Sequence, residues 1–147
     1  NKFTITTNMQ DKLLQLNLES LRLGLVSSEK FMNRPILVFN SASFCGFTKQ
    51  IYDMQKVYEA GSVVPMALPT NEFGKQEPGD DIEISQYYES KFKVTFPVLK
   101  KTDLKHIIFT KHGQPTWNFN KYLFNKNHDF VARFDSNVPV TEVIKNV

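Results

Sequence analysis

The sequence is poor in cysteine: its 147 residues contain only Cys45. A single cysteine cannot form a disulfide within these residues, so the cysteine content does not indicate an oxidising compartment. Long hydrophobic runs are also missing, and none approaches the roughly 18 residues that read as a membrane-spanning helix. We therefore expect no membrane span.

An excess of charge of one sign is absent as well. Lysine and arginine number 18 against 15 acidic residues, a net charge of +3, and the basic residues are scattered along the chain. Binding to nucleic acid calls for a basic patch or stripe, so we expect no nucleic-acid partner.

The histidines His106, His112 and His128 lack metal-ligand spacing with the cysteine. We expect them in surface loops and expect no metal site.

The residues that are present indicate a globular protein. Hydrophobic residues make up 41% and aromatic residues 13% of the chain, which is ordinary for a soluble fold. The length predicts one domain over residues 1–147, with a core that buries roughly 70% of the unfolded surface. The start at Asn1 fits a trimmed cytoplasmic protein and a periplasmic or secreted protein without its leader equally well, so the compartment stays open.

Hydrophobic periodicity predicts alternating strands and helices. Strands are expected at residues 3–7, 35–39, 62–68 and 94–99, and a β-hairpin is expected at 116–124 and 130–134. Helices are expected at 46–60, 81–92 and 140–147, the second of them opened by a capping box of Asp80 and Glu83. Residues 13–25 fit strand and helix equally. This order predicts an α/β fold, a three-layer sandwich with a mixed central sheet flanked by helices.

Cys45 lies in the segment NSASFCGFTKQ, between a predicted strand and a predicted helix. We expect it on the first turn of that helix, where the macrodipole favours a reactive thiolate. A helix end supplies about 0.3–1 kcal/mol, whereas lowering a thiol pKa by two units takes roughly 2.7 kcal/mol. Further N–H donors are therefore needed. A buried cysteine that acts only as a small hydrophobic residue is the alternative.

Three segments resemble the glutathione peroxidase family. NSASFCGFTKQ is similar to the motif around the family's peroxidatic selenocysteine or cysteine, and LPTNEFGKQEPGDDIEI is similar to its second motif. WNFNKYLFNKNHDFVARF resembles the third, Trp-Asn-Phe with the hairpin that follows. The resemblance implies a thioredoxin-like fold.

The resemblance also implies the site residues. Cys45 would be the peroxidatic residue, and Gln76, Trp117 and Asn118 would complete a tetrad around it. Their amide and indole N–H groups can donate to a thiolate without adding a positive charge. By the same resemblance Pro97 would follow a cis peptide bond.

The implied reaction is reduction of hydrogen peroxide or an organic hydroperoxide by the Cys45 thiolate, without a prosthetic group. Relatives that use thioredoxin carry a resolving cysteine on the second helix, where this chain has Ser85 and Glu89, and Thr70 replaces the cysteine usual in the second motif. The reductant would therefore be an external thiol: glutathione, another small thiol or a redox protein. The segment from residue 102 to 115 is short for the family's oligomer-contact loop, so we expect a monomer.

Two other functions fit the sequence. A thioredoxin-like binding protein with weakened chemistry would explain the missing resolving cysteine and the shortened loops. A thiol redox sensor would pass the oxidation of Cys45 to a partner protein. The presence of all four tetrad residues argues against a decayed site.

Overall fold

The computed structural model describes residues 19–20, 24–25 and 31–147. Glu19–Ser20 (β1) pairs antiparallel with Gly24–Leu25 (β2), so part of the ambiguous segment is strand. The strand expected at residues 3–7 lies outside the described residues. None of the described helices is long and apolar enough to cross a membrane.

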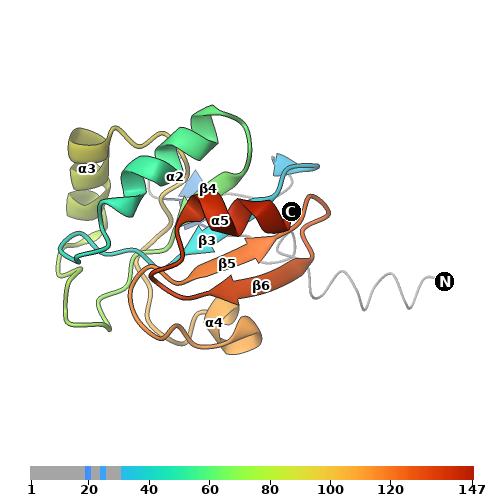
Figure 1. The fold of residues 1–147 in the computed structure, drawn as a ribbon. Coiled ribbons are helices and arrows are strands. Elements are labelled where there is room, and N and C mark those ends of the chain that lie inside the picture. The colour runs from blue at the N-terminus through green and yellow to red at the C-terminus, as the bar shows by residue number, and fades with distance from the viewer. Residues whose placement is uncertain (1–18, 21–23, 26–30) are drawn as a thin grey trace.

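A four-stranded mixed sheet forms the centre of the molecule (Figure 1). Its order is β4-β3-β5-β6, with β3 at Ile36–Phe39, β4 at Val64–Ala67, β5 at Lys121–Phe124 and β6 at Phe130–Phe134. β3 and β4 are parallel, whereas β5 is antiparallel to β3 and to β6. Pro65 occurs in an edge strand, where a missing N–H donor is tolerated. The predicted strands at 35–39 and 62–68 and the hairpin are confirmed.

Alternate residues of β3 face two different cores, as a strand buried on both sides requires. Leu37 and Phe39 pack with residues of the helices α2, at Gln50–Glu59, α3, at Asp81–Phe92, and α5, at Val140–Val143. Ile36 and Val38 instead pack with the short helix α4, at Ile107–His112. Figure 1 shows α2 and α5 on one side of the sheet and α4 on the other. The predicted three-layer sandwich is confirmed.

The capping box predicts the start of α3 correctly. Asp80 accepts a hydrogen bond from the Glu83 N–H at 2.8 Å, and the Glu83 carboxylate accepts one from the Asp80 N–H at 3.1 Å. The last predicted helix is also present, as α5 followed by a 3-10 turn at Ile144–Asn146 (η3).

Four local predictions are wrong. Residues 94–99 form two isolated bridges, from Val98 to Ala67 and from Leu99 to Ser20, instead of a strand. Residues 107–112, for which the sequence predicts no helix, form α4. The helix expected at 46–60 begins at Gln50, and the described residues contain no cis peptide bond, so Pro97 follows a trans bond. A trans X-Pro bond is the default by about 0.5–1 kcal/mol.

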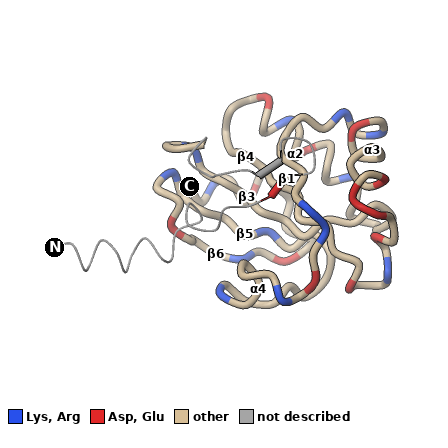
Figure 2. Tube along the Cα trace, turned by 180° about the vertical axis from the view of Figure 1, so that it is seen from behind, with Lys and Arg blue, Asp and Glu red and all other residues tan. Residues whose placement is uncertain are grey.

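The strand directions determine where the site lies. β3 and β4 end at the same edge of the sheet, and β5 starts there because it runs antiparallel to β3. The segments after Phe39 and Ala67 and the segment before Lys121 therefore meet at this edge, the usual place for sites in α/β sheets. Figure 2 shows basic and acidic residues interspersed along the described chain, in agreement with the scattered charges of the sequence.

Candidate active site

Cys45 lies in a loop between β3 and α2 and is half-buried. The N–H groups of Thr48 and Gln50 bond to the carbonyls of Cys45 and Phe47 at 3.0 and 2.9 Å, so tight turns separate the thiol from the helix. The prediction that Cys45 occupies the first helical turn is therefore wrong. Among the described residues, the hydrogen bond to Cys45 Sγ comes from the N–H of Phe47, at 3.4 Å.

Thr48 fixes the shape of this loop. Its Oγ1 accepts a hydrogen bond from the Cys45 N–H at 2.9 Å and donates one to the Ala42 carbonyl at 2.8 Å. Thr48 and Ala42 are buried, so these bonds form away from solvent competition. The N–H and the carbonyl of Cys45 are thus both bonded to Thr48.

The second motif lies against the cysteine loop. The N–H of Phe44, the residue before Cys45, donates to the Gln76 carbonyl at 3.1 Å. The hydroxyl of Ser43, one residue before Phe44, donates to the carboxylate of Glu77, one residue after Gln76, and Glu77 has no exposed surface. These contacts place Gln76 beside the loop that carries Cys45.

Asn40 connects the first motif to the third. Its side-chain Nδ2 donates to the Trp117 carbonyl at 2.8 Å, and its own carbonyl accepts from the Phe119 N–H at 2.7 Å. Asn40 directly follows β3, and residues 117–119 directly precede β5. The two loops therefore meet at the edge of the sheet that the topology predicts.

Asn118 connects the third motif to the second. Its Nδ2 donates to Gln76 Oε1 at 3.0 Å and to the Phe73 carbonyl at 3.1 Å. The Phe73 carbonyl can only accept, so the atom that faces it must be the amide nitrogen. Both hydrogens of Nδ2 are thus engaged by described residues, which leaves the side-chain amide of Asn118 no further hydrogen to donate.

The Trp117 indole packs over the loop of the second motif. Its ring lies 5.7 Å from that of Phe73, and 38% of the residue remains exposed. Gly74 has φ +69°, and a Cβ there would lie 3.2 Å from the indole. Glycine is therefore required by the backbone conformation and by the close approach of the ring. No described residue accepts a hydrogen bond from the indole N–H or from Gln76 Nε2.

Comparison with known proteins identifies the family of the chain. A family model described as glutathione peroxidase matches residues 13–121. The chain belongs to the glutathione peroxidase family. It is accordingly a thiol-dependent peroxidase, an oxidoreductase that acts on peroxides.

Individual relatives cover most of the chain. Glutathione peroxidase 7 of Mus musculus is 35% identical, over 84% of this chain and 74% of the relative. Glutathione peroxidase-like peroxiredoxin 2 of Saccharomyces cerevisiae is 34% identical, over 74% of this chain and 77% of the relative. The crystal structure of Trgpx in apo form superposes with a TM-score of 0.68 at 23% identity, and the match covers 91% of both chains. The fold is therefore thioredoxin-like, as predicted.

The sequence analysis missed Glu77, a buried carboxylate that lies beneath the cysteine loop and accepts hydrogen bonds there. Its two carboxylate oxygens accept hydrogen bonds from the hydroxyls of Ser43 and Tyr88, and the Tyr88 hydroxyl also lies 2.8 Å from the Ser41 hydroxyl. Burial raises the pKa of Glu77, and burial together with the charge of Glu77 raises the pKa of Tyr88 well above its ordinary value. The second motif includes this glutamate, but an acidic residue in a predicted loop is expected to be solvated, so its burial could not be predicted.

The histidines do not all lie in surface loops, so that prediction is wrong. His128 is 1% exposed, with Nε2 3.1 Å from the Phe31 carbonyl. His112 is the last residue of α4, and its ring stacks on that of Phe130 at 4.2 Å. Within the described part of the chain, no group of three or more His, Cys, Asp and Glu residues could hold a metal ion.

Proposed function

We propose that Cys45 is the peroxidatic residue and that an external thiol regenerates it. The observation that carries this proposal is the position of Cys45, the one cysteine of the 147 residues, in a loop bonded to the segment of Gln76. That segment is bonded in turn to Asn118. Hydrogen bonds thus join the cysteine loop to Gln76, and Gln76 to the loop of Trp117 and Asn118.

The reaction proceeds by attack of the Cys45 thiolate on the outer oxygen of a peroxide. The S–O bond forms as the O–O bond breaks, and the departing oxygen takes a proton to become water or an alcohol. Cysteine is oxidised by two electrons to a sulfenic acid, and the peroxide is reduced by two. The Phe47 N–H at 3.4 Å supports the negative charge on sulfur before attack.

Gln76 and Trp117 have complementary roles in this reaction. Their Nε2 and indole N–H groups stabilise the charge that develops on the departing oxygen, as neutral donors do in oxyanion holes. Asn118, with both amide hydrogens engaged, holds the Gln76 carbonyl oxygen and so directs Gln76 Nε2 towards the peroxide.

The return to thiol takes two equivalents of an external thiol, such as glutathione, or a dithiol redox protein. The first thiol displaces water from the sulfenic acid and forms a mixed disulfide, and the second releases Cys45 and forms the oxidised disulfide. Helix α3 carries Ser85 and Glu89 where a resolving cysteine would lie, so the chain has no internal thiol for this step. No prosthetic group is needed.

Space for the organic part of a substrate lies beside the cysteine loop, at Phe44 rather than at Cys45 itself. A cavity of about 400 Å³ opens beside Phe44, and it is lined by Ser43, Phe44, Glu77, Pro78, Gly79, Glu83, Ile84 and Tyr87. Its partly apolar walls suit the organic portion of a hydroperoxide, and hydrogen peroxide needs less space. Both are therefore proposed as substrates.

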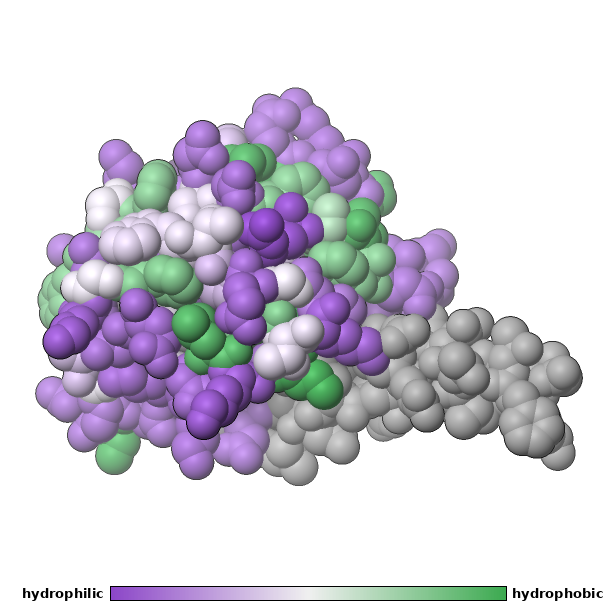
Figure 3. Space-filling model, turned by 90° about the horizontal axis from the view of Figure 1, so that it is seen from below, coloured by the Kyte–Doolittle hydropathy of each residue, from purple (hydrophilic) through white to green (hydrophobic). Residues whose placement is uncertain are grey.

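We expect the protein to act as a monomer. In the face seen in Figure 3, hydrophobic residues lie in separate small patches among hydrophilic ones, whereas stable homodimers bury large apolar surfaces. Sedimentation at micromolar concentration should give the mass of one chain. A dimer mass would contradict this expectation.

The reductant is identified by measuring peroxide consumption with glutathione, with cysteine and with a reduced thioredoxin system as separate electron donors. At least one donor should sustain turnover by the wild-type protein, and Cys45→Ser should sustain none. After treatment with peroxide alone, intact mass should show one added oxygen on Cys45, and with a sulfenic-acid trap it should show one adduct of the trapping reagent in place of that oxygen. Equal turnover by Cys45→Ser would overturn the proposed role of the thiol.

A further inference from the structure

A lysine without exposed surface lies directly behind the site. Lys121, the first residue of β5, faces the same side of the sheet as Leu123, towards α2 and α5. Its Nζ donates to the Ser136 carbonyl at 2.8 Å and reaches the Asp135 carbonyl at 3.5 Å. Among the described residues no carboxylate forms an ion pair with it, an unusual situation for a buried ammonium.

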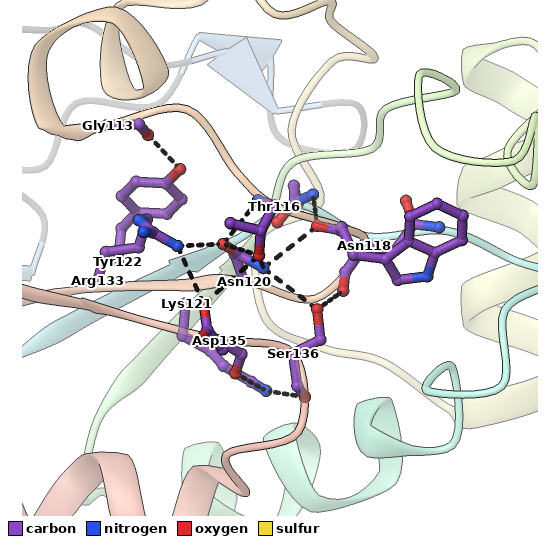
Figure 4. Close-up of polar contacts among 11 residues, drawn as sticks. Gly113, Thr116, Asn118, Asn120, Lys121, Tyr122, Arg133, Asp135 and Ser136 are labelled. Carbon is purple, nitrogen blue, oxygen red and sulfur yellow. Dashed lines mark hydrogen bonds and ion pairs between the residues drawn. The ribbon is translucent and has the colours of Figure 1, made fainter.

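Ser136 bonds to Lys121, to the start of α2 and to the loop of Asn118. Figure 4 shows its bonds to Lys121 and Asn118. Its carbonyl also accepts a hydrogen bond from Gln50 Nε2 at 2.8 Å, and Gln50 is the first residue of α2, directly after the cysteine loop. The hydroxyl of Ser136 donates to the Asn118 carbonyl at 2.5 Å. One buried residue thus holds the start of α2 and the loop of Trp117 and Asn118.

Asn120 holds the same loop from the other end. Its Oδ1 accepts from the Thr116 N–H at 3.0 Å and from the Arg133 guanidinium at 2.6 Å. Its Nδ2 donates to the Trp117 carbonyl at 3.3 Å and to the Ser136 hydroxyl at 3.2 Å. Arginine can only donate, so this orientation of the Asn120 amide is fixed.

We propose that Lys121 and Ser136 are positioning residues of the peroxidase, which hold the Asn118 loop and the start of α2 in the geometry that the reaction needs. The inference rests on the proposed function of Cys45. Within the described part of the chain, no hydrogen bond joins Lys121 or Ser136 to Cys45 or to the side-chain N–H groups of Gln76 and Trp117. Lys121 and Ser136 act through the main chain of Asn118 and through Gln50, and a small displacement of such groups can slow a reaction by about 100-fold.

The charge of Lys121 makes this function dependent on pH. Burial lowers the pKa of Lys121 to about 7, and the nearby Asp135 opposes that effect. Asp135 is itself paired with Arg133 at 3.3 Å. Other charged groups on the elements packed against Lys121 are exposed: Lys49 before α2, Asp53 on α2 and Glu142 on α5. A neutral amine still donates, but its hydrogen bond is roughly half as strong as that of an ammonium.

The test compares the rate of Cys45 oxidation by hydrogen peroxide, measured by trapping and intact mass, in Lys121→Met, Ser136→Ala and Ser136→Thr. Lys145→Met removes an exposed lysine and is the control. The first two variants should be about 10–100-fold slower than wild type, and Ser136→Thr, which keeps the hydroxyl, should regain most of the rate. The ratio of wild-type to Lys121→Met rates should fall at least threefold from pH 6 to pH 8.5.

The two proposals fail in different ways. A wild-type rate no faster than that of free cysteine would overturn the proposed function. A fast wild-type rate with Ser136→Ala within twofold of it would overturn the positioning role. Amide hydrogen exchange at residues 45–50 and 116–119 tests positioning without peroxide. Measured on Ser136→Ala, it also tests the proposal if Lys121→Met does not fold. Ser136→Ala should accelerate exchange in both segments, and unchanged exchange would overturn the inference.

Discussion

Asn118 Nδ2 lies 3.0 Å from Gln76 Oε1, and its second hydrogen bonds to the Phe73 carbonyl at 3.1 Å. The side chain of Asn118 is completely buried, and its amide has no hydrogen left for sulfur or peroxide. Of the three residues expected to donate directly, two keep free N–H groups in the described structure. The third orients one of those two.

This arrangement predicts that Asn118 and Gln76 act as one unit. Gln76→Ala and Asn118→Ala should each slow Cys45 oxidation by about 10–100-fold, because each removes or misdirects the same donor. The double variant should then be no slower than Gln76→Ala alone, since coupled residues are not additive. A double variant with the product of the two single effects would show that Asn118 donates independently.

Trp117 is predicted to contribute its indole N–H rather than only its packing. Trp117→Phe keeps a ring against Gly74 and Phe73 but removes the donor, and oxidation of Cys45 should slow by about tenfold or more. The variant lacks the chain's one tryptophan, so the rate is followed by trapping and mass. Phe73→Leu, which disturbs the packing alone, is the matched control and should have a smaller effect. Unchanged kinetics would remove Trp117 from the mechanism.

Glu77 is predicted to support the cysteine loop through its buried hydrogen bonds. Glu77→Ala leaves the Ser43 and Tyr88 hydroxyls without this acceptor and should lower the free energy of unfolding by about 2–4 kcal/mol. Glu77→Gln keeps one acceptor oxygen and should cost less. Urea unfolding of both variants measures the difference, and an Ala variant as stable as wild type would contradict the prediction.

The pH dependence of stability gives a second check on Glu77. Its folded pKa lies above that of the unfolded chain because of burial, so the native state holds the proton to higher pH. Wild type should therefore lose stability relative to Glu77→Gln as the pH rises from about 4.5 through the folded pKa. A constant difference across that range would mean that Glu77 ionises as freely as in the unfolded chain.

For Lys121 we predict the opposite change of stability with pH, at higher pH. Its folded pKa of about 7 lies below the ordinary 10.5, so between these values the unfolded chain binds more protons than the native state. The free energy of unfolding should rise with pH in this window, by at most about 1.4 kcal/mol per pH unit, relative to Lys121→Met. Urea unfolding at pH 7, 8 and 9 measures it. Parallel curves for the two proteins would contradict the burial of a titrating lysine.

The sequence predicts the layers and most strands because their signals are local. The run from Ile36 to Phe39 is apolar on both faces, and the Asp80 and Glu83 pair occupies the required capping positions. The predicted start of α2 is wrong for a physical reason. Thr48 bonds back to Ala42 and to the Cys45 N–H, so side-chain contacts hold tight turns where periodicity alone predicts helix.

The candidate site is predictable to the extent that its residues belong to recognisable motifs. Cys45, Gln76, Trp117 and Asn118 were found in this way, and the structure brings their segments together. Lys121, Ser136 and Glu77 were missed because burial reverses what their polarity implies: a lysine in a strand and a glutamate in a loop read as solvated. Only the three-dimensional arrangement shows that these three are enclosed.

The most direct test of the central claim, that Cys45 is an activated peroxidatic thiol, is stopped-flow fluorescence of Trp117 after mixing the reduced protein with hydrogen peroxide. Trp117 is the one tryptophan, and it packs on the loop of Gln76. Oxidation at least 1,000-fold faster than that of free cysteine, roughly 4 kcal/mol of transition-state stabilisation, is predicted, and it should be absent in Cys45→Ser. Oxidation at the rate of free cysteine would contradict the account.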